Sequence, residues 1–540
     1  MRNLRHRTIF ALLPAGLVAL AWACSSTPAA TSPGTDSGAD ADAGDDADSS
    51  ILDDLGGGPD GSTSSCTLGD GVTDPVALCV EEQIITQELR YAYVKGKGVA
   101  PGWSSTAPYT ALPRTSTSWQ DDLALAGAMG AFYCSAEVYG NNHLDSTLAG
   151  ALDDLGGVLV PELQQALLTG YDGEVYFRLR WAQAAYNYAS DVTATKLQSM
   201  ANTYAASIAG QVYAVPAGGD GGSAGGMVIG VKNADGSVTY SPAQAVMAAA
   251  AMLDMGVLEA GGADAGATSP AWAAIAQQVL AYVLARGRDP VSGLFYQSLV
   301  TSADPGHDTV GAGSPTSDSM LTETQAWTIL GLARAQDLLA AYQMKPLADA
   351  GAEAGADASA PLGPVYYQAT IALAAAIATD GLFDGTATPP PAPAVQPVGA
   401  LMEGIILSGQ QLLTDKTTIG NAIYLGGLHR VAVGAGVPQA YELGQIRSAL
   451  GWAPAGTLQL ANTSLLTIVT DTSGDLLQQT YLRAGSKTFQ FAQAYSPGGE
   501  PVTQGQEPGA TNYLTAANHA MVEGFTQLWY GAANDPRCAP

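Results

Sequence analysis

The chain has 540 residues and carries 49 Asp and Glu against 21 Lys and Arg, a formal net charge of -28. This excess of negative charge repels phosphates and anionic headgroups, so it argues against nucleic-acid binding and against electrostatic docking on a membrane. Only 13% of the residues are charged, so we expect a surface rich in Ser, Thr, Asn, Gln and Gly.

Residues 1–23 have the layout of an export signal peptide. Arginines precede an apolar run from Ile9 to Leu20, and small residues surround a cut before Cys24. The run is shorter than the ~20 residues that a spanning helix needs. A cysteine directly after the cut resembles the bacterial lipoprotein signal, which implies a lipid on Cys24 as the chain's contact with a membrane, facing the periplasm or cell exterior. Ala21 and Ala23 also fit ordinary signal peptidase, which would leave a secreted protein.

Residues 24–65 consist mostly of Ala, Asp, Gly, Ser, Thr and Pro. This composition buries too little apolar surface to offset the entropy of ordering, so it predicts a disordered acidic tether. Calcium binding by the aspartates from Asp40 to Asp48 is the alternative, but no glycine-turned loop closed by Glu follows them. Residues 66–540 are then long enough for one large domain or two ordinary ones, and we predict one.

Four cysteines remain after Cys24, an even set that suits two disulfides in an oxidising compartment: Cys66, Cys79, Cys134 and Cys538. Three pairings are possible. The short loop favours Cys66–Cys79, which leaves Cys134–Cys538 to join the ends of the domain. The alternative for Cys134 is a buried free thiol inside an apolar helix. No cysteine and histidine spacing typical of zinc occurs, so no metal site is predicted.

From residue 66 on, apolar residues recur at steps of three and four, which is the period of helices. The pattern predicts helices over 76–94, 119–138, 144–169, 174–190, 193–211, 241–256, 270–286, 320–343, 363–379, 398–414, 417–433 and 510–532. Strand signals are few. They predict a small β-hairpin within 458–491 and a second hairpin formed by Met227–Val231 and Val238–Tyr240.

Two kinds of helix alternate along the chain. One kind opens with a polar cluster and continues with small residues, as at 119–128, 241–250, 322–333, 400–412 and 512–526. The other kind is bulkier and amphipathic, as at 174–190 and 270–286. Small-residue helices suit an inner layer and amphipathic ones an outer layer. We therefore predict an all-α fold, an (α/α)6 toroid of helical hairpins.

Four short motifs resemble those of the six-hairpin, or (α/α)6-barrel, glycosidase superfamily: Trp119–Ala126, Asp289–Tyr296, Thr322–Trp327 and Asp380–Gly385. The resemblance implies a carbohydrate-processing toroid. The adjacent aspartates at positions 121 and 122 are similar to the pair of the family 76 endo-mannanases, which implies nucleophile and acid/base roles. This chain has Leu, Ala and Leu directly after the pair, where that family has aromatic residues.

Hydrolysis of a glycosidic bond needs two carboxyl groups flanking the bond, and polar residues that start inner helices would face one central cavity. The catalytic candidates are Asp121, Asp122, Glu323 and Glu403. Adjacent helical residues diverge by ~100°, so one aspartate can act on a sugar while the other orients water or caps the helix. Helix capping without catalysis is the alternative for both.

Glu323 and Trp327 are four residues apart and share a helix face, which suits an acid beside a stacked sugar ring. The alternative is a helix-start carboxylate above a core tryptophan. Glu403 lies in an apolar context that raises the pKa of a carboxyl group, as a general acid requires. The candidates for substrate binding are Trp119, Gln325, Trp327, Asn518 and His519.

The sequence therefore predicts a monomeric surface or secreted lipoprotein that binds a glycan or another small polar ligand in a central cleft. No nucleotide or cofactor motif occurs, so no cofactor is predicted. The rival hypothesis is a non-catalytic binding or scaffold protein on the same toroid. A lyase or epimerase would instead need basic groups beside the acids, with Arg178, Arg180 and His519 as the residues to inspect.

Overall fold

The structure is a computed structural model, and the chain divides into two units, residues 1–45 and 46–540. All described residues belong to the second unit: 74–104, 109–138, 146–166, 170–216, 226–261, 269–302, 308–310, 319–343, 365–379, 382, 401–406, 411–433, 491–495, 501–502 and 512–527. The predicted signal peptide, the tether, Cys24, Cys66, Cys538 and residues 458–490 of the predicted hairpin lie outside this set.

Helices dominate the described residues. They are α1 (Asp74–Tyr91), α2 (Trp119–Val138), α3 (Ser146–Gln165), α4 (Gly173–Ala189), α5 (Asp191–Gly210), α6 (Pro242–Gly261), α7 (Ser269–Arg286), α8 (Thr322–Gln343), α9 (Val365–Thr379), α10 (Thr418–Val433) and α13 (Thr515–Gln527). The helix predicted over 119–138 is confirmed at both ends. None of the described helices is both long and apolar enough to cross a membrane.

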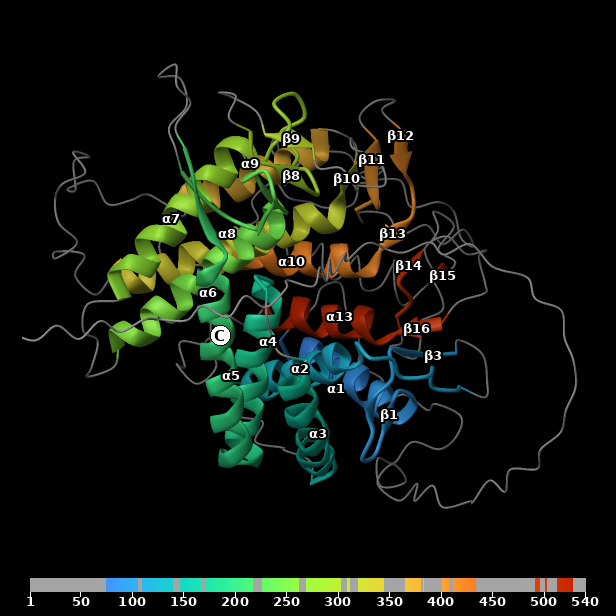
Figure 1. The fold of residues 1–540 in the computed structure, drawn as a ribbon. Coiled ribbons are helices and arrows are strands. Elements are labelled where there is room, and N and C mark those ends of the chain that lie inside the picture. The colour runs from blue at the N-terminus through green and yellow to red at the C-terminus, as the bar shows by residue number, and fades with distance from the viewer. Residues whose placement is uncertain are drawn as a thin grey trace, which may run out of the picture. The chain divides into compact units, whose positions relative to one another are not determined.

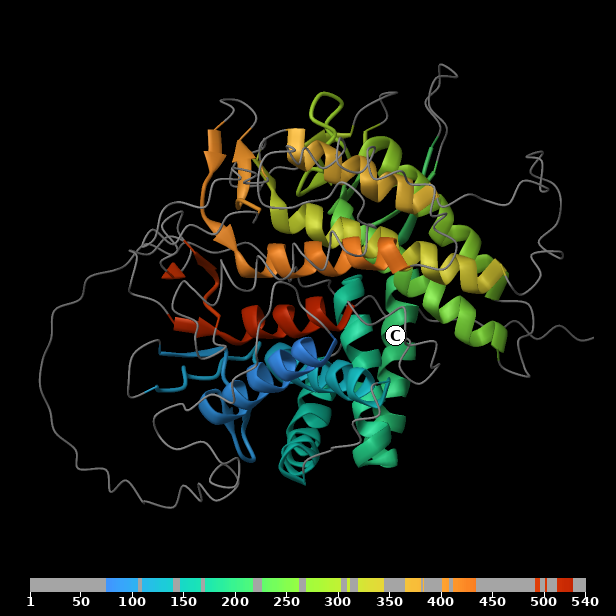
Figure 2. The same ribbon diagram turned by 180° about the vertical axis from the view of Figure 1, so that it is seen from behind.

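Six of the described helices close into a ring. In order around the ring they are α2, α4, α6, α8, α10 and α13, each packing against the next, and α13 packs back against α2. Figures 1 and 2 show α8, α10 and α13 stacked in this order. Every described side chain of α6 from Ala245 to Leu253 is buried, as a helix enclosed on all sides requires. This closed ring confirms the predicted inner layer of an (α/α)6 toroid.

The other described helices form the outer layer, and most lie over the junction of two ring helices. α1 contacts α13 and α2, α3 contacts α2 and α4, α5 contacts α4 and α6, and α9 contacts α8 and α10, while α7 packs on α6. α5 buries a single stripe of residues three to four positions apart, which is the amphipathic pattern expected of an outer helix. One prediction is wrong: residues 174–190 form the inner helix α4, because both its bulky and its polar faces find partners inside the protein.

Close contacts between the ring helices depend on missing side chains. A Cβ atom on Gly130 of α2 would lie 2.0 Å from the Trp181 carbonyl oxygen of α4. A Cβ atom on Gly524 of α13 would lie 2.5 Å from the Ala422 carbonyl oxygen of α10. The small residues of these helices therefore allow the backbones to approach closely, as their composition predicts.

The strands are short and belong to small antiparallel sheets. They are β1 (Tyr93–Val94), β2 (Gly98–Val99), β3 (Gly102–Ser104), β4 (Val212–Val215), β5 (Gly226–Ile229), β6 (Val231–Lys232), β7 (Val238–Tyr240), β8 (Leu299–Val300), β9 (Thr309–Val310), β10 (Ser319–Leu321), β11 (Gly404–Ile406), β12 (Gln411–Leu413), β13 (Lys416–Thr417), β14 (Ala494–Tyr495), β15 (Pro501–Val502) and β16 (Asn512–Leu514). Three of them, β10, β13 and β16, lead directly into α8, α10 and α13, so these sheets gather at the N-terminal ends of ring helices (Figure 1).

Two local predictions need correction. The helix predicted over 398–414 is wrong, because β11 and β12 form a hairpin there that pairs with β10. A Cβ atom on Gly404 would lie 2.5 Å from the Met320 carbonyl oxygen, so the glycine lets β11 approach β10. The hairpin of β6 and β7 is confirmed, but residues 226–229 pair with β4 instead.

Candidate active site

Carboxyl groups occupy the first turns of three ring helices. Asp121 lies in the first turn of α2, Glu174 in that of α4 and Glu323 in that of α8. All three side chains are only partly exposed. Helix N-termini favour negative charge, because their free N–H groups and the helix dipole attract it. The ring therefore brings acids from separate parts of the sequence to the same end of the inner layer.

Asp121 has surroundings that keep it partly protonated near neutral pH. Burial raises the pKa of Asp121 to about 7, and the charges of Glu88 and Asp122 act in the same direction, while His519 and Arg178 oppose them. A carboxyl group with a pKa near 7 is partly protonated at neutral pH and can still give up its proton. Asp121 therefore has the property of a general acid.

A buried pair lies beside Asp121. The Nε2 atom of His519 on α13 is 2.5 Å from the Oε1 atom of Glu88 on α1, and both residues are buried. Burial lowers the pKa of His519 to about 3, and Arg178 acts in the same direction, so the imidazole is neutral. Burial raises the pKa of Glu88 well above its ordinary value. The pair thus shares a single proton, and His519 is too enclosed for the predicted contact with substrate.

Arg178 ties the acids of two ring helices together. It forms an ion pair with Glu174, four residues earlier on α4, and its Nε atom is 3.0 Å from the Oε1 atom of Glu523 on α13. The side chains of Arg178, Glu174 and Glu523 are 12%, 13% and 7% exposed, so solvent still reaches an otherwise enclosed network. Burial raises the pKa of Glu174, with Asp172, Glu523 and Glu323 adding to the rise and Arg178 acting against it. Arg180, in contrast, binds Asp254 away from these acids.

Glu323 is linked to Trp327 and Glu403. Burial raises the pKa of Glu323, the indole N–H of Trp327 donates a hydrogen bond that favours its ionised form, and the charge of Glu403 raises the pKa further. The two α8 side chains thus share a face, as their spacing predicts. The backbone N–H of Thr322 donates to the Glu403 carbonyl oxygen at 2.8 Å, which places Glu403 at the start of α8.

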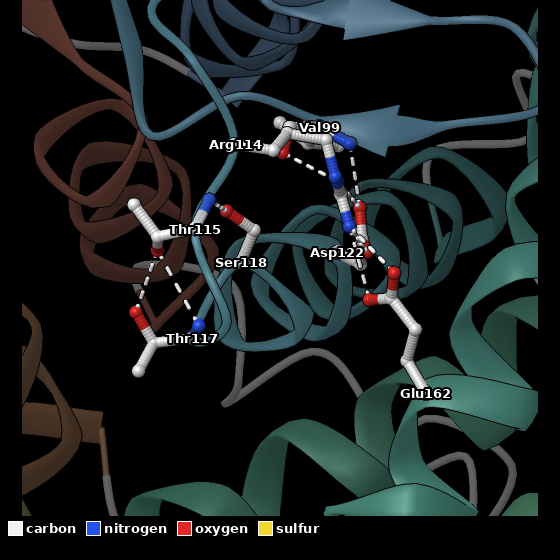
Figure 3. Close-up of polar contacts among 7 residues, drawn as sticks. All are labelled: Val99, Arg114, Thr115, Thr117, Ser118, Asp122 and Glu162. Atoms are coloured by element: carbon white, nitrogen blue, oxygen red, sulfur yellow. Dashed lines mark hydrogen bonds and ion pairs between the residues drawn. The ribbon is translucent and has the colours of Figure 1, made fainter.

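Three predicted site residues are engaged elsewhere. The Gln325 amide is buried and binds the backbone N–H and carbonyl oxygen of Phe295, each at 2.8 Å. The Asn518 amide is buried and binds the backbone of Phe491. Asp122 is buried and accepts from the Val99 N–H at 2.6 Å and from both terminal nitrogens of Arg114 (Figure 3). All three side chains therefore hold backbone segments, those of Phe295, Phe491 and Val99.

The remaining predictions concern an aromatic residue, cysteines and metals. Trp119 is partly buried and packs against the core at the start of α2. Cys79 lies in α1 and Cys134 in α2, but their side chains are outside the described residues, so the disulfide pairing stays a prediction. Within the part of the chain that the structure describes, no group of three or more His, Cys, Asp or Glu side chains is arranged to hold a metal ion.

Sequence reasoning missed Glu88 and Glu174, and it named Arg178 only as a residue to inspect for a lyase or epimerase. Glu88 had a detectable signal, because it lies one heptad after Glu81 on the helix face that also carries buried Ile84 and Ile85. An acid at such a core position indicates a buried partner. Glu174 and Arg178 gave only the signal of a common surface ion pair at helical spacing.

Several solved structures are similar to this chain. An unsaturated glucuronyl hydrolase specific for heparin aligns with a TM-score of 0.50 and 13% identity over 85% of this chain and 98% of that chain. An unsaturated glucuronyl hydrolase from Bacillus sp. GL1 gives a TM-score of 0.47 and 14% identity over 85% and 98% of the two chains. The GH76A alpha-1,6-mannanase from Salegentibacter sp. HEL1_6 gives 0.43 and 10% over 84% and 99%.

No protein-family model matches the chain, and no curated protein matches it in sequence. The fold is established by the ring of helices and the first of these likenesses: the chain has an (α/α)6 toroid fold.

Proposed function

We propose that this chain is a carbohydrate-processing enzyme that hydrolyses a glycosidic bond at the N-terminal ends of its ring helices. The observation that carries the proposal is Asp121, a partly exposed carboxyl group with a pKa of about 7 among further acids on a glycosidase-type toroid. Fold by itself does not fix activity, so the proposal depends on these side chains.

Asp121 serves as the general acid. Its proton passes to the glycosidic oxygen as the bond from that oxygen to the anomeric carbon breaks, so the leaving sugar departs as an alcohol. A second carboxylate either removes a proton from the attacking water or attacks the anomeric carbon itself, with water completing the reaction in a second step. Both routes consume one water molecule. In the two-step route Asp121 regains its proton from that water, whereas in the one-step route the second carboxylate takes the proton and Asp121 is reprotonated through solvent.

Glu323 is the best candidate for the second carboxylate. Burial raises the pKa of Glu323, and the hydrogen bond from the Trp327 indole N–H offsets part of that rise in favour of the ionised form that a base or nucleophile requires. Glu174, in contrast, has its carboxylate occupied by Arg178. Glu403 acts through its charge on Glu323, since each carboxylate disfavours ionisation of the other.

Trp327 and Trp119 are the candidates for contact with sugar rings. Trp119 is the first residue of α2, and Trp327 follows the first turn of α8. Both side chains are partly exposed, so one face of each indole can remain available for stacking on a sugar. The enzyme would act outside the cytoplasm, because its first 23 residues resemble an export signal and Cys24 follows the cut. Its ligand would be a glycan, without a cofactor, and the protein would act as a monomer.

The test uses the full chain and a panel of neutral, acidic and amino polysaccharides, with release of reducing ends as the readout. We expect at least one polysaccharide to be cleaved, and the Asp121→Asn variant to lose ~10²–10⁴ in rate while folding normally. Asn is isosteric with Asp but cannot donate the proton. Saturable binding without cleavage by the wild type would favour the binding or scaffold hypothesis instead.

A further inference from the structure

A repeated contact holds the backbone at the start of three ring helices. The fourth residue of α8, α10 and α13 is an amide: Gln325, Asn421 and Asn518. Each amide accepts a hydrogen bond from one backbone N–H and donates to the carbonyl oxygen of the same residue. The distances are 2.8 and 2.8 Å to Phe295, 2.7 and 3.0 Å to Leu401, and 3.2 and 3.5 Å to Phe491.

The first residue of each of these helices is a threonine, and its hydroxyl binds the backbone segment that belongs to the neighbouring ring helix. The Thr418 hydroxyl donates to the Ala492 carbonyl oxygen at 2.6 Å, directly after Phe491. The Thr515 hydroxyl donates to the Ala100 carbonyl oxygen at 2.6 Å, directly after Val99. The Thr322 hydroxyl binds the carbonyl oxygen of Met402, directly after Leu401. The segments at Leu401 and Phe491 are thus each held by two neighbouring ring helices, through an amide of one and a threonine of the other.

The segment that begins at Val99 is the equivalent segment for α2. We call the two hydrogen bonds between one side chain and the N–H and carbonyl oxygen of such a segment an amide clamp. Its next residue is held by Thr515 of α13, so the pattern requires an amide at the fourth position of α2, and Asp122 stands there. A carboxylate can accept the Val99 N–H, and does so at 2.6 Å, but it has no proton for the Val99 carbonyl oxygen. Arg114 supplies that donor, with its NH1 nitrogen 2.5 Å from the carbonyl oxygen (Figure 3).

Arg114 is fixed for this task. Its two terminal nitrogens also bind Asp122 at 2.9 and 2.7 Å, and one of them reaches Glu162 of α3 at 2.9 Å. Gly98 makes room for the pair, since a Cβ atom there would lie 2.4 Å from an Asp122 oxygen and 2.5 Å from an Arg114 nitrogen. Asp122 and Arg114 together therefore make the two contacts that a single amide makes on α8, α10 and α13.

We propose that Asp122 and Arg114 form a positioning pair that replaces an amide clamp, and that Asp122 takes no part in proton transfer. The adjacent aspartates then have separate roles: Asp121 acts on the substrate, and Asp122 holds the Val99 segment beside it. The assignment of Asp121 rests on the proposed function, but the clamp does not.

The test follows from the chemistry of an amide. In the double variant Asp122→Asn/Arg114→Met, the new amide can accept from the Val99 N–H and donate to its carbonyl oxygen. We expect this variant, and Asp122→Asn alone, to keep the polysaccharide-cleaving rate within about tenfold of the wild type, whereas Asp121→Asn loses ~10²–10⁴. Asp122→Ala should lose activity that Asp122→Asn restores. A folded Asp122→Asn variant as inactive as Asp121→Asn would overturn the proposal.

A second readout is independent of any activity. Amide hydrogen exchange at residues 98–104 should be at least about tenfold faster in Asp122→Ala than in the wild type, because the Val99 N–H loses its acceptor. The double variant and Asp122→Asn should keep wild-type protection there. Loss of protection in Asp122→Asn equal to that in Asp122→Ala would refute the clamp. If the wild type cleaves no polysaccharide, the proposed function fails, and this measurement alone decides the clamp.

A reverse substitution provides the matched control. Asn518→Asp removes the amide donor that lies 3.5 Å from the Phe491 carbonyl oxygen and keeps an acceptor for the Phe491 N–H. We expect faster exchange at Phe491, because the new side chain then holds the segment at one atom instead of two, and unchanged exchange at Val99. Equal protection in Asn518→Asp and the wild type would contradict the need for a separate donor beside a carboxylate.

Discussion

Burial acts on Asp121 and His519 in opposite directions, because it disfavours the charged form of each. It raises the pKa of Asp121 to about 7 and lowers that of His519 to about 3. The acid therefore holds its proton more tightly, and the base loses its own. A neutral imidazole beside Asp121 opposes the acid's protonation far less than an imidazolium would. Buried Glu88 keeps His519 in place without adding a positive charge.

The first prediction concerns the pH dependence of the proposed hydrolysis. Above about pH 7 Asp121 loses its proton, so kcat/KM should fall by about tenfold for each further pH unit. The measurement is the initial rate of cleavage at low substrate concentration across a series of buffers. A rate that stays constant or rises through neutral pH would remove Asp121 from the role of general acid.

The second prediction concerns stability at the same residue. The pKa of Asp121 is about 7 in the folded chain against an ordinary 3.8, so the folded state binds the proton more tightly than the unfolded state. This contribution is fully present below pH ~4 and is lost as the pH rises through about 7. Asp121→Asn does not titrate. Its Tm should therefore approach or exceed that of the wild type increasingly as the pH is raised over this window.

The comparison of Tm values carries its own control. Groups distant from Asp121 titrate alike in the wild type and in the Asp121→Asn variant, so their contributions cancel in the difference between the two curves, which reports Asp121 and the neighbours coupled to it. A difference that stays constant over the window, or moves against the variant with rising pH, would show that Asp121 is not protonated by its surroundings.

Helices of this ring pack through glycine where their backbones meet. Gly130 of α2 faces the α4 backbone, whereas Gly157 of the outer helix α3 is exposed and has no atom within 4 Å of a built Cβ. Glycine therefore allows close helix packing at position 130, whereas at position 157 a side chain would meet no other atom. Helix propensity by itself favours alanine over glycine at both.

The third prediction uses these two glycines as a matched pair. Gly130→Ala should destabilise the protein by about 1–3 kcal/mol or more, because its methyl group would overlap the Trp181 carbonyl oxygen. Gly157→Ala should stabilise it by up to about 1 kcal/mol. Denaturant unfolding of both variants measures the two changes. Equal effects of the two substitutions would contradict the close packing of α2 on α4.

At the scale of the whole fold, Arg178 joins two ring helices that lie on either side of a third. α4 and α13 both pack on α2, and the ion pair of Arg178 with Glu523 connects residues 345 positions apart in the sequence. The network is enclosed, so its carboxylates depend on the arginine for compensation. Closure of the ring and the protonation of the site are thus linked through one side chain.

The fourth prediction removes that compensation. Arg178→Met should destabilise the protein by about 3–5 kcal/mol above pH 8, where Glu174 is ionised, since it leaves Glu174 and Glu523 buried without a positive partner. The loss should shrink as the pH is lowered, because protonated carboxyl groups need no partner. Denaturant unfolding at several pH values tests both statements. A pH-independent loss would indicate that Arg178 contributes through packing.

Much of the fold was predictable because helix signals are local. The polar start and small-residue run of α2 gave both of its ends, and the repeated helix starts indicated a toroid. Residues 398–414 misled because a short apolar run carries no clear period, and only pairing with β10 makes it a hairpin. α4 misled because Tyr176, Phe177, Trp181 and Tyr186 are buried while its arginines form ion pairs within the fold, which the period of the sequence cannot show.

The sequence by itself determined the helical class, the layered arrangement and the acids at helix starts, because caps, periods and composition act within a few residues. Tertiary structure decided which of those acids meet. Asp121 and Asp122 are neighbours of the same type, yet one joins Glu88, His519 and Arg178, and the other binds Val99 and Arg114. Their difference arises from helices distant in sequence, whose charge and burial reach a side chain only once the ring has closed.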